Sequence, residues 1–280
     1  MTKFVRKVFL VDALGTGPFT GSPTFVVFLQ APLDKFKMAT ISHELGTSQT
    51  VFVLAHNRAY LLRFFNQFQE VPLGGHACHA VAHLIYELGL LPPGKTLTCL
   101  TQEGELTARL TPTGHIAVSF PSQNLSKMEP ANLELYGSML ALTPKDITWG
   151  AITSTRQAIL AVGPSVNLKT LEPDRIKLAK SGASTLAVTF ATPADREYGL
   201  RCFSPNIYHP EQQVSVNVNR ALAPHWARLL GTKLLRVRQF SSRGGLSEID
   251  VTSPSRVIIS GQSQTVLRAD LAEVLTEDLM

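Results

Sequence analysis

The sequence predicts an α+β fold with two pseudo-symmetric domains, each a curved mixed β-sheet, or half-barrel, around a central helix. Three observations lead to this prediction. Short apolar segments typical of strands outnumber helical segments along the 280 residues. Each half carries one long segment in which apolar residues recur at helical spacing. A strand, loop and helix unit near residue 62 recurs near residue 200, and such duplication indicates two similar domains.

The first half is expected to consist mainly of short strands. Asp34 can cap a helix that runs to about Leu45. A second helix is expected from the Gly-Gly-His step at residues 74–76 to about Leu88, because apolar residues recur there every three or four positions. The apolar, turn-bounded segments predict strands at residues 7–14, 24–29, 51–55, 60–65, 96–101, 104–111 and 115–120.

The polar stretch at residues 121–130 is the best linker candidate. It predicts domains at residues 1–122 and 131–280, with the C-terminal strand as a candidate to return to the first domain. In the second half, helices are expected at residues 131–142, 172–180 and 214–230. Strands are expected at residues 158–162, 185–192, 198–203, 234–240, 246–251, 257–261 and 265–271.

Composition and charge narrow the function classes. With 44% hydrophobic and 17% charged residues, the chain is an ordinary globular protein. Its net charge of +5 comes from 26 scattered lysines and arginines, without the basic and aromatic runs of a nucleic-acid binder. A mildly basic surface that attracts acidic metabolites is the simpler interpretation.

Cysteine content and the N-terminus indicate the compartment. Three cysteines without CxxC spacing, Cys78, Cys99 and Cys202, argue against a disulfide framework. The apolar run at the N-terminus ends at Asp12 and is too short for a signal peptide, and no segment reaches the ~20 apolar residues of a membrane span. We therefore expect a soluble, cytoplasmic protein.

The Gly-Gly-His step has a chemical use at the start of a helix. Two glycines let a ligand approach backbone that is turning into a helix, where free N–H groups and the positive end of the helix dipole hold a carboxylate. His76 would lie at the edge of that anion site. The plainer alternative is a structural turn followed by a hydrogen-bonded histidine.

The repeated strand, loop and helix unit supports the anion site independently of the Gly-Gly-His step. Residues 200–204 repeat the pattern of residues 62–66, and each copy is followed by a loop with an acidic residue, Glu70 in the first and Glu211 in the second. A cleft between two such halves would have two helix N-termini pointing into it. A small anionic, carboxylate-bearing substrate would be expected there.

Several blocks together resemble the PhzF family of phenazine-biosynthesis-like proteins, within the diaminopimelate epimerase fold. The resemblance covers nearly the whole chain. The blocks are Phe19, Gly21 and Pro23 (F-x-G-N-P, with Ser22 for Asn), Ser48, Thr50 and Phe52 (S-E-T-x-F), residues 70–77 (E-V-P-F-C-G-H-A), residues 221–226 (A-L-A-P-Y-W), residues 239–245 (Q-x-S-x-R-G-G) and Gly261 with Gln262 (G-Q).

The resemblance implies cofactor-free chemistry in a buried cleft, often in a homodimer. The best-known member of the family isomerises a dihydro-hydroxyanthranilate by moving a proton with a glutamate. That glutamate falls on Gln49, and the acidic residue of E-D-P-x-T-G-S-A falls on Gln212. A carboxamide cannot bind and release a proton near neutral pH, so the proton shuttle of the family cannot run through Gln49. Racemisation by two opposed thiols is also in doubt, because Gly74 and Gln213 stand about where the thiols would be.

Three interpretations of the site follow. In the first, amides orient and polarise the substrate of an isomerase or cyclase that performs a pericyclic reaction or a rearrangement. In the second, proton transfer survives on Glu44, Glu70 or Glu211. In the third, the protein binds a small molecule without converting it. For the glutamines, the bland alternative is solvent-facing polar filler.

The predicted site residues divide into catalytic and binding candidates. The catalytic candidates are His76, Gln49 and Gln212. The substrate-binding candidates are Gly75, Ala77, Ser48, Ser22, Gln213, Ser215 and Asn217. No metal site is predicted: His76, His79 and His83 share a helix face, but a solvated polar face is the favoured explanation. Cys78 is expected to be a packed small residue.

Overall fold

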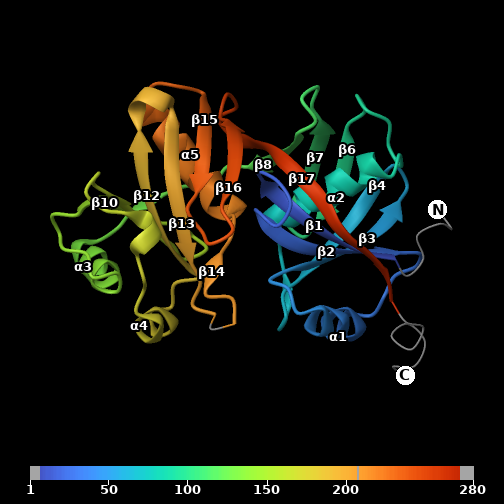
Figure 1. Ribbon diagram of the computed structural model, residues 1–280, viewed down its shortest axis with the longest axis horizontal. Coiled ribbons are helices and arrows are strands. Elements are labelled where there is room, and N and C mark those ends of the chain that lie inside the picture. The colour runs from blue at the N-terminus through green and yellow to red at the C-terminus, as the bar shows by residue number, and fades with distance from the viewer. Residues whose placement is uncertain (1–6, 207, 272–280) are drawn as a thin grey trace. The chain divides into compact units, whose positions relative to one another are not determined.

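The computed structural model describes residues 7–206 and 208–271, and these form two compact units. The first unit comprises the described residues up to Phe120 together with those from Ser260 onward, and the second unit comprises Pro121–Ile259. Each unit is a mixed sheet around one helix, which confirms the predicted fold class (Figure 1). No helix within residues 7–206 and 208–271 is long and apolar enough to cross a membrane.

The sheet of the first unit forms a closed ring around helix α2 (Gly75–Glu87). Strands β1 and β2, β3 and β4, and the meander β6–β7–β8 pair antiparallel, whereas β2–β3 and β4–β6 pair parallel. Strand β17 pairs with both β1 and β8 and so completes the ring, which removes the free edges of the sheet. The strands are β1 (Lys7–Gly15), β2 (Ser22–Leu29), β3 (Thr50–His56), β4 (Ala59–Phe65), β5 (Glu70–Val71), β6 (Leu97–Thr101), β7 (Gly104–Leu110), β8 (Ile116–Pro121) and β17 (Arg256–Asp270).

The second unit wraps a sheet around helix α5 (Val216–Leu230). Its strands lie in the order β9, β10, β11, β12, β13, β15, β16, with parallel pairs β11–β12 and β13–β15. They are β9 (Ser126–Lys127), β10 (Ile147–Ile152), β11 (Gln157–Val162), β12 (Thr185–Thr192), β13 (Glu197–Phe203), β14 (Glu211–Gln212), β15 (Leu234–Gln239) and β16 (Gly245–Asp250).

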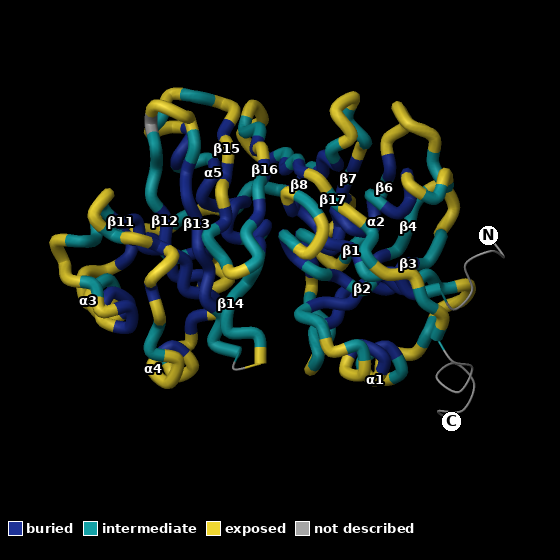
Figure 2. Tube along the Cα trace, in the orientation of Figure 1, coloured by how far each residue is buried: buried dark blue, intermediate teal, exposed yellow. Residues whose placement is uncertain are grey.

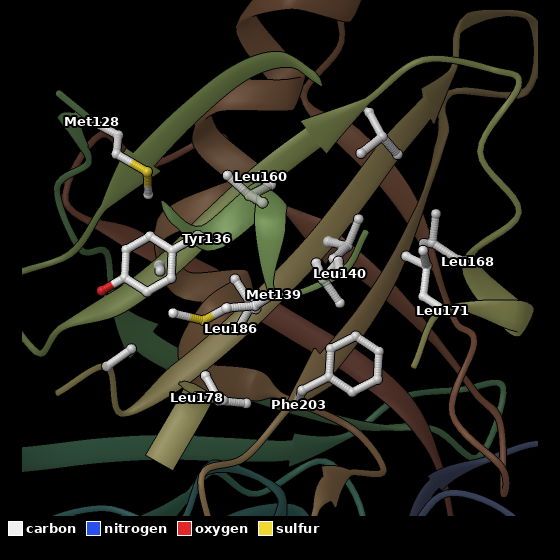
Figure 3. Close-up of a cluster of buried hydrophobic side chains, with 14 residues drawn as sticks. Met128, Tyr136, Met139, Leu140, Leu160, Leu168, Leu171, Leu178, Leu186 and Phe203 are labelled. Carbon is white, nitrogen blue, oxygen red and sulfur yellow. The ribbon is translucent and has the colours of Figure 1, made fainter. Parts of the chain in front are cut away.

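Helices cover the outer faces of the two sheets. In the first unit, α1 (Lys35–Leu45) packs on a core that includes Phe52 and Phe65. In the second, α3 (Pro130–Ser138) and α4 (Arg175–Lys180) supply part of a larger apolar cluster with Leu160, Leu186 and Phe203 (Figure 3). Each of these helices carries both buried and exposed residues (Figure 2). Burying apolar side chains such as these is the dominant favourable contribution to folding.

Cap residues set the ends of these helices. Asp34 accepts backbone N–H bonds at the start of α1, as predicted, and Gly46 ends it in the left-handed conformation with φ 69°. Ser215 caps α5 through a bond from the backbone N–H of Val218. Helix α2 differs, because its N-cap residue is Gly74, which has no side chain to offer. The first turn of α2 therefore lacks a side-chain cap.

Strand registers confirm the predicted duplication. Phe65 faces Glu70 across the β4–β5 pair, and Phe203 faces Glu211 across the β13–β14 pair. Helix α2 starts four residues after β5 ends, and α5 starts four residues after β14 ends. This register makes Gly74 equivalent to Ser215. The family resemblance instead pairs Gly74 with Gln213, as the two positions where opposed thiols would be.

Some elements differ from the prediction. Strand β10 was not predicted, because its sequence, ITWGAI, has neither strict alternation nor a continuous apolar run. The two strands expected at residues 257–261 and 265–271 are one continuous strand, β17. The polar residues 262–264 suggested a turn, but they pair with β1. Helix α3 ends at Ser138 and α4 begins at Arg175, so both are shorter than expected.

Candidate functional site

The first turn of α2 presents backbone donors at one end of the closed barrel. Its amides from Gly75 to Ala77 have no carbonyl four residues earlier within the helix, and the positive end of the helix dipole lies there. The first intrahelical bond runs from the amide of Cys78 to the carbonyl oxygen of Gly74, at 3.0 Å. Gly75 and Ala77 are buried, so their backbone amides are what they can offer a ligand.

Gln49 lies directly against this turn. Its side chain is buried, and a Cβ atom at Gly74 would overlap all three heavy atoms of the Gln49 carboxamide. The backbone carbonyl oxygen of Gln49 accepts bonds from the Phe25 amide at 3.2 Å and from Thr47 Oγ1 at 2.9 Å. The Oε1 atom is buried without a hydrogen-bond partner among the described residues. Gln49 is therefore not a solvent-facing surface residue, and its Oε1 atom can accept a hydrogen bond from a ligand.

Two further hydroxyl groups on the inner face of the barrel were not predicted. Val11 pairs with Thr24 and with Thr265, and Thr265 lies against α2, so Thr24 also faces that helix. By the same registers, Ser263 and Ser22 flank Ala13 on this face. The hydroxyl oxygens of Thr24 and Ser263 are buried without a partner in the described part of the chain.

The sequence contained a signal for one of these residues. Ser22 and Thr24 alternate along one strand, so they share a face. Ser263 could not be placed, because its neighbours on β1 lie about 250 residues earlier in the chain. The predicted candidate Ser22 is buried, whereas Ser48 is half-buried in the loop before β3.

His76 is the titratable group of this turn. Its Nε2 atom is buried and has no hydrogen-bond partner within the described residues. Burial, with a smaller effect of the nearby His79, lowers the pKa of His76 from its ordinary value to about 4. His76 is therefore neutral at pH 7, where its imidazole can accept or donate a hydrogen bond without adding a charge.

This pKa predicts how stability depends on pH. The unfolded chain takes up a proton on His76 near pH ~6.5, before the folded protein does. The stability associated with neutral His76 is thus fully present above that pH and is lost as the pH falls toward about 4. NMR titration of the imidazole should show a midpoint near pH 4, and His76→Gln should weaken the acid destabilisation between pH 4 and 6.5. A midpoint near 6.5 would contradict this burial argument.

The histidine face of α2 is not the solvated face that the sequence suggested. His79 is fully buried, its ring stacks on Phe120 at 5.8 Å, and its Nδ1 lies 3.1 Å from the carbonyl oxygen of Gly75. His83 Nε2 lies 3.2 Å from Thr265 Oγ1. Strands β8 and β17 close the ring around α2, so His79 is buried and His76 and His83 are only partly exposed. Over residues 7–206 and 208–271, no group of three or more histidine, cysteine, aspartate or glutamate residues could hold a metal ion.

Two candidate site residues of the second unit, Gln212 and Gln213, form hydrogen bonds with other residues of the same unit. Gln212 Nε2 donates to Thr185 Oγ1 at 2.8 Å. Gln213 Oε1 accepts from the hydroxyl of Ser242 and from the backbone amide of Arg243, at 3.3 and 3.2 Å, so it holds the β15–β16 hairpin. Gln213 is thus engaged in a structural contact.

Ser215 and Asn217 lie in the first turn of α5. Ser215 caps the helix, and Asn217 Oδ1 lies 3.5 Å from Nη1 of Arg220. Asn217 is the repeat equivalent of His76. His76, Gln49, Gly75, Ala77 and Ser22 belong to the first unit, and Gln212, Gln213, Ser215 and Asn217 belong to the second.

Two arginine and glutamate pairs hold the loops before both helices, a role that the sequence did not reveal. Arg63 Nε and Nη2 donate to the two carboxylate oxygens of Glu70 at 2.7 and 2.8 Å, and this pairing lowers the pKa of Glu70. Arg201 Nε donates to Glu211 Oε1 at 2.6 Å. Glu44 is exposed on α1. Glu70 and Glu211, which the sequence offered as alternative proton carriers, are both engaged in ion pairs.

The three cysteines are free and buried. Cys78 packs in the core next to α2's first turn, as expected for a small apolar residue. Burial raises the pKa of Cys99 and of Cys202, so their thiols stay protonated and are poor nucleophiles.

Comparison with known proteins yields a consistent set of relatives. An uncharacterized isomerase of Pseudomonas aeruginosa is 32% identical over 265 residues, which cover 94% of this chain and 98% of the relative. An uncharacterized isomerase of Halalkalibacterium halodurans is 29% identical over 94% of this chain and 97% of the relative. A PhzF-family crystal structure from Enterococcus faecalis superposes with a TM-score of 0.82 at 24% identity, covering 95% of this chain and 98% of that one.

The family assignment rests on a match along most of the chain. The PhzC-PhzF family model, described as phenazine biosynthesis-like protein, matches residues 11–269. This range includes the whole of the α2 turn, Gln49, and the repeated unit in the second half. The chain therefore belongs to the PhzC-PhzF family of phenazine biosynthesis-like proteins.

Proposed function

We propose that the protein is a cofactor-free isomerase that binds a small carboxylate-bearing molecule at the first turn of α2. The observation that carries the proposal is that Gln49 Oε1 and His76 Nε2 at this turn are buried and have no hydrogen-bond partner among the described residues. Thr24 Oγ1 and Ser263 Oγ, on the sheet face toward α2, are also buried and unpartnered within the described part of the chain. Buried polar atoms are nearly always hydrogen-bonded in native proteins, so several together favour a bound partner. Relatives named as isomerases support the reaction class.

The amides of the turn suit a carboxylate. Helix N-termini hold anions through backbone N–H groups and the helix dipole, and Gly74 leaves these amides without a competing side-chain cap. Because His76 is neutral at pH 7, the helix terminus supplies the attraction for the anion and His76 supplies a hydrogen bond. Gln49 Oε1 would accept a hydrogen bond from a hydroxyl or amino group of the same ligand.

The chemistry proposed is a rearrangement, which can include cyclisation, of a substrate held in a reactive conformation. Gln49 cannot shuttle a proton, but a fixed amide can orient a substrate and stabilise charge as it develops. The Gly74 backbone and the buried position of Gln49 restrict the motion of its amide. Gln49 would thus raise the reaction rate because its amide is already held in a fixed orientation before the substrate binds.

The test is conversion of a panel of small unsaturated and hydroxylated carboxylic acids in D2O, followed by NMR. We expect wild type to convert at least one acid without incorporating solvent deuterium. We expect Gln49→Ala to lower kcat/KM by ~100-fold, as for the loss of one preorganised hydrogen-bonding group. Gln102→Ala, which changes an exposed glutamine in the β6–β7 turn, is the matched control and should leave the rate unchanged.

Three outcomes would count against the proposal. Deuterium uptake by wild type would show that a proton carrier acts in place of Gln49. Binding of an acid without conversion would favour a small-molecule binder. An unchanged rate in both Gln49→Ala and His76→Ala would show that conversion takes place elsewhere.

A further inference from the structure

A second group of buried polar atoms lies in the interior of the second unit. Gln239 is 3% exposed, Ser247 1% and Asn219 0%. Both amide atoms of Gln239, the hydroxyl of Ser247 and Nδ2 of Asn219 have no hydrogen-bond partner among the described residues. Leaving such atoms unpaired costs roughly 1–3 kcal/mol each, so a native fold seldom groups them without a partner.

The three side chains share the α5 side of the sheet. Tyr198 pairs with Val237 across β13–β15, and its hydroxyl donates to Asn219 Oδ1 of α5 at 2.8 Å, so this face points to the helix. Gln239 lies two residues after Val237 on the same face, and Ser247 is the cross-strand partner of Val237. Gly245, the cross-strand partner of Gln239, has no side chain.

The fold itself does not require polar residues at two of these three positions. In the repeat, Asn219 is equivalent to Cys78, and Ser247 is equivalent to Leu106. Both residues of the first unit are buried apolar side chains. Gln239 is equivalent to Thr101, which is also polar, so Asn219 and Ser247 are the polar residues that are specific to the second unit.

The unpaired donors and acceptors of these side chains indicate which kind of ligand they can bind. Asn219 Oδ1 is used by Tyr198, whose buried hydroxyl keeps its proton because burial raises the pKa of Tyr198 well above its usual value. The Nδ2 group of Asn219 is therefore left as a donor. Together the three side chains offer two amide donors, an amide acceptor and a hydroxyl that can act as either, and none of them carries a charge. A small neutral ligand that both donates and accepts hydrogen bonds would match these donors and acceptors.

We propose that Gln239, Ser247 and Asn219 bind ordered water that bridges them behind the first turn of α5. A buried water needs two to four polar partners, and the group supplies them. The polar atoms are buried and uncharged, and water is a small neutral molecule that can lie among buried side chains. The bridging water would tie β15 and β16 to the turn that carries Ser215 and Asn217.

A thermodynamic cycle tests the proposal. Gln239→Met and Ser247→Ala should each lower Tm by roughly 2–4 °C, the effect of about one lost buried hydrogen bond in a protein of this size. If both side chains hold the same water, the double variant should lose little more than the larger single change, because the first change already releases the water. Additive losses would overturn the proposal.

A control cycle and a structure complete the test. Gln157 is also buried in the second unit, but its Oε1 accepts from Thr153 Oγ1, so Gln157→Met and Ser247→Ala should be additive. A high-resolution crystal structure of wild type should show solvent density within hydrogen-bonding distance of Gln239 and Ser247. A dry pocket in that structure would overturn the proposal whatever the cycle gives.

Discussion

Gly74→Ala is expected to destabilise the protein by ~1–3 kcal/mol and to abolish ligand binding at the α2 turn. The new Cβ would overlap the Gln49 carboxamide, so either the amide or the start of α2 must move. Gly74 has an ordinary φ of −108°, so the cost comes from crowding and not from the backbone conformation. Urea unfolding measures the first effect, and calorimetric titration with a converted or bound acid measures the second.

Two comparisons isolate the cause of this effect. Gly17→Ala is the matched control, because a Cβ there would meet no heavy atom within 4 Å, and its unfolding free energy should change by less than about 0.5 kcal/mol. Gly74→Ala should also be less harmful in a Gln49→Ala background, where the overlapping amide is absent. Equal losses of stability in both backgrounds would show that Gln49 does not occupy the space beside Gly74.

Arg201→Met is expected to lower the free energy of unfolding by ~3–5 kcal/mol, the largest loss among the substitutions considered. Arg201 is 8% exposed and pairs with Glu211. Its Nη1 also donates to the carbonyl oxygens of Leu168, Lys169 and Leu171, at 2.8, 3.0 and 2.7 Å. Methionine keeps much of the side-chain volume but removes the Arg201 donor from three carbonyl groups and from Glu211. The Glu211 side chain is 13% exposed, and its other carboxylate oxygen accepts from the Ser242 amide. Denaturant unfolding of the purified variant measures the loss.

The matched control is an ion pair on the same sheet that is open to solvent. Arg238 Nε donates to Glu197 at 3.0 Å, but the arginine side chain is 53% exposed. Arg238→Met should therefore cost no more than about 1 kcal/mol. Similar losses for the two arginines would mean that the buried carbonyl contacts of Arg201 contribute little.

Local patterns were sufficient to predict the repeated framework. Helix α2 follows from apolar residues at helical spacing after a glycine pair, and α1 follows from the cap at Asp34. The duplication followed from similar residues around Arg63 and Arg201, and the registers of β4–β5 and β13–β14 confirm it. These features depend on residues close in sequence, which is why the sequence alone predicts them.

Features that depend on distant pairing could not be predicted. Strand β17 closes the ring beside β1, and this closure buries His79 and brings Ser263 to the inner face. A single sequence does not reveal which strands pair across about 250 residues. The hairpin contact of Gln213 and the carbonyl contacts of Arg201 likewise join segments that are some thirty residues apart.

The sequence marks candidate site residues but not their surroundings. Gln49, Gly75 and His76 are candidates because the family motifs mark their positions, and the structure places Gln49 against Gly74 at the start of α2. Thr24 belongs to no quoted motif, and only the register of β1 with β2 places it on the face of α2. The neutral state of His76 depends on burial, which the composition of the helix did not predict.

The most direct test of the proposed anion site at the first turn of α2 is an NMR titration of the 15N-labelled protein with small carboxylates such as acetate, benzoate and sorbate. If the α2 turn is the anion site, the backbone amide signals of Gly75, His76 and Ala77 should shift most and in a saturable way. Gly74→Ala should remove these shifts, whereas Gly17→Ala should keep them. Saturable shifts that leave these three amides unmoved and gather elsewhere in the chain would contradict the account.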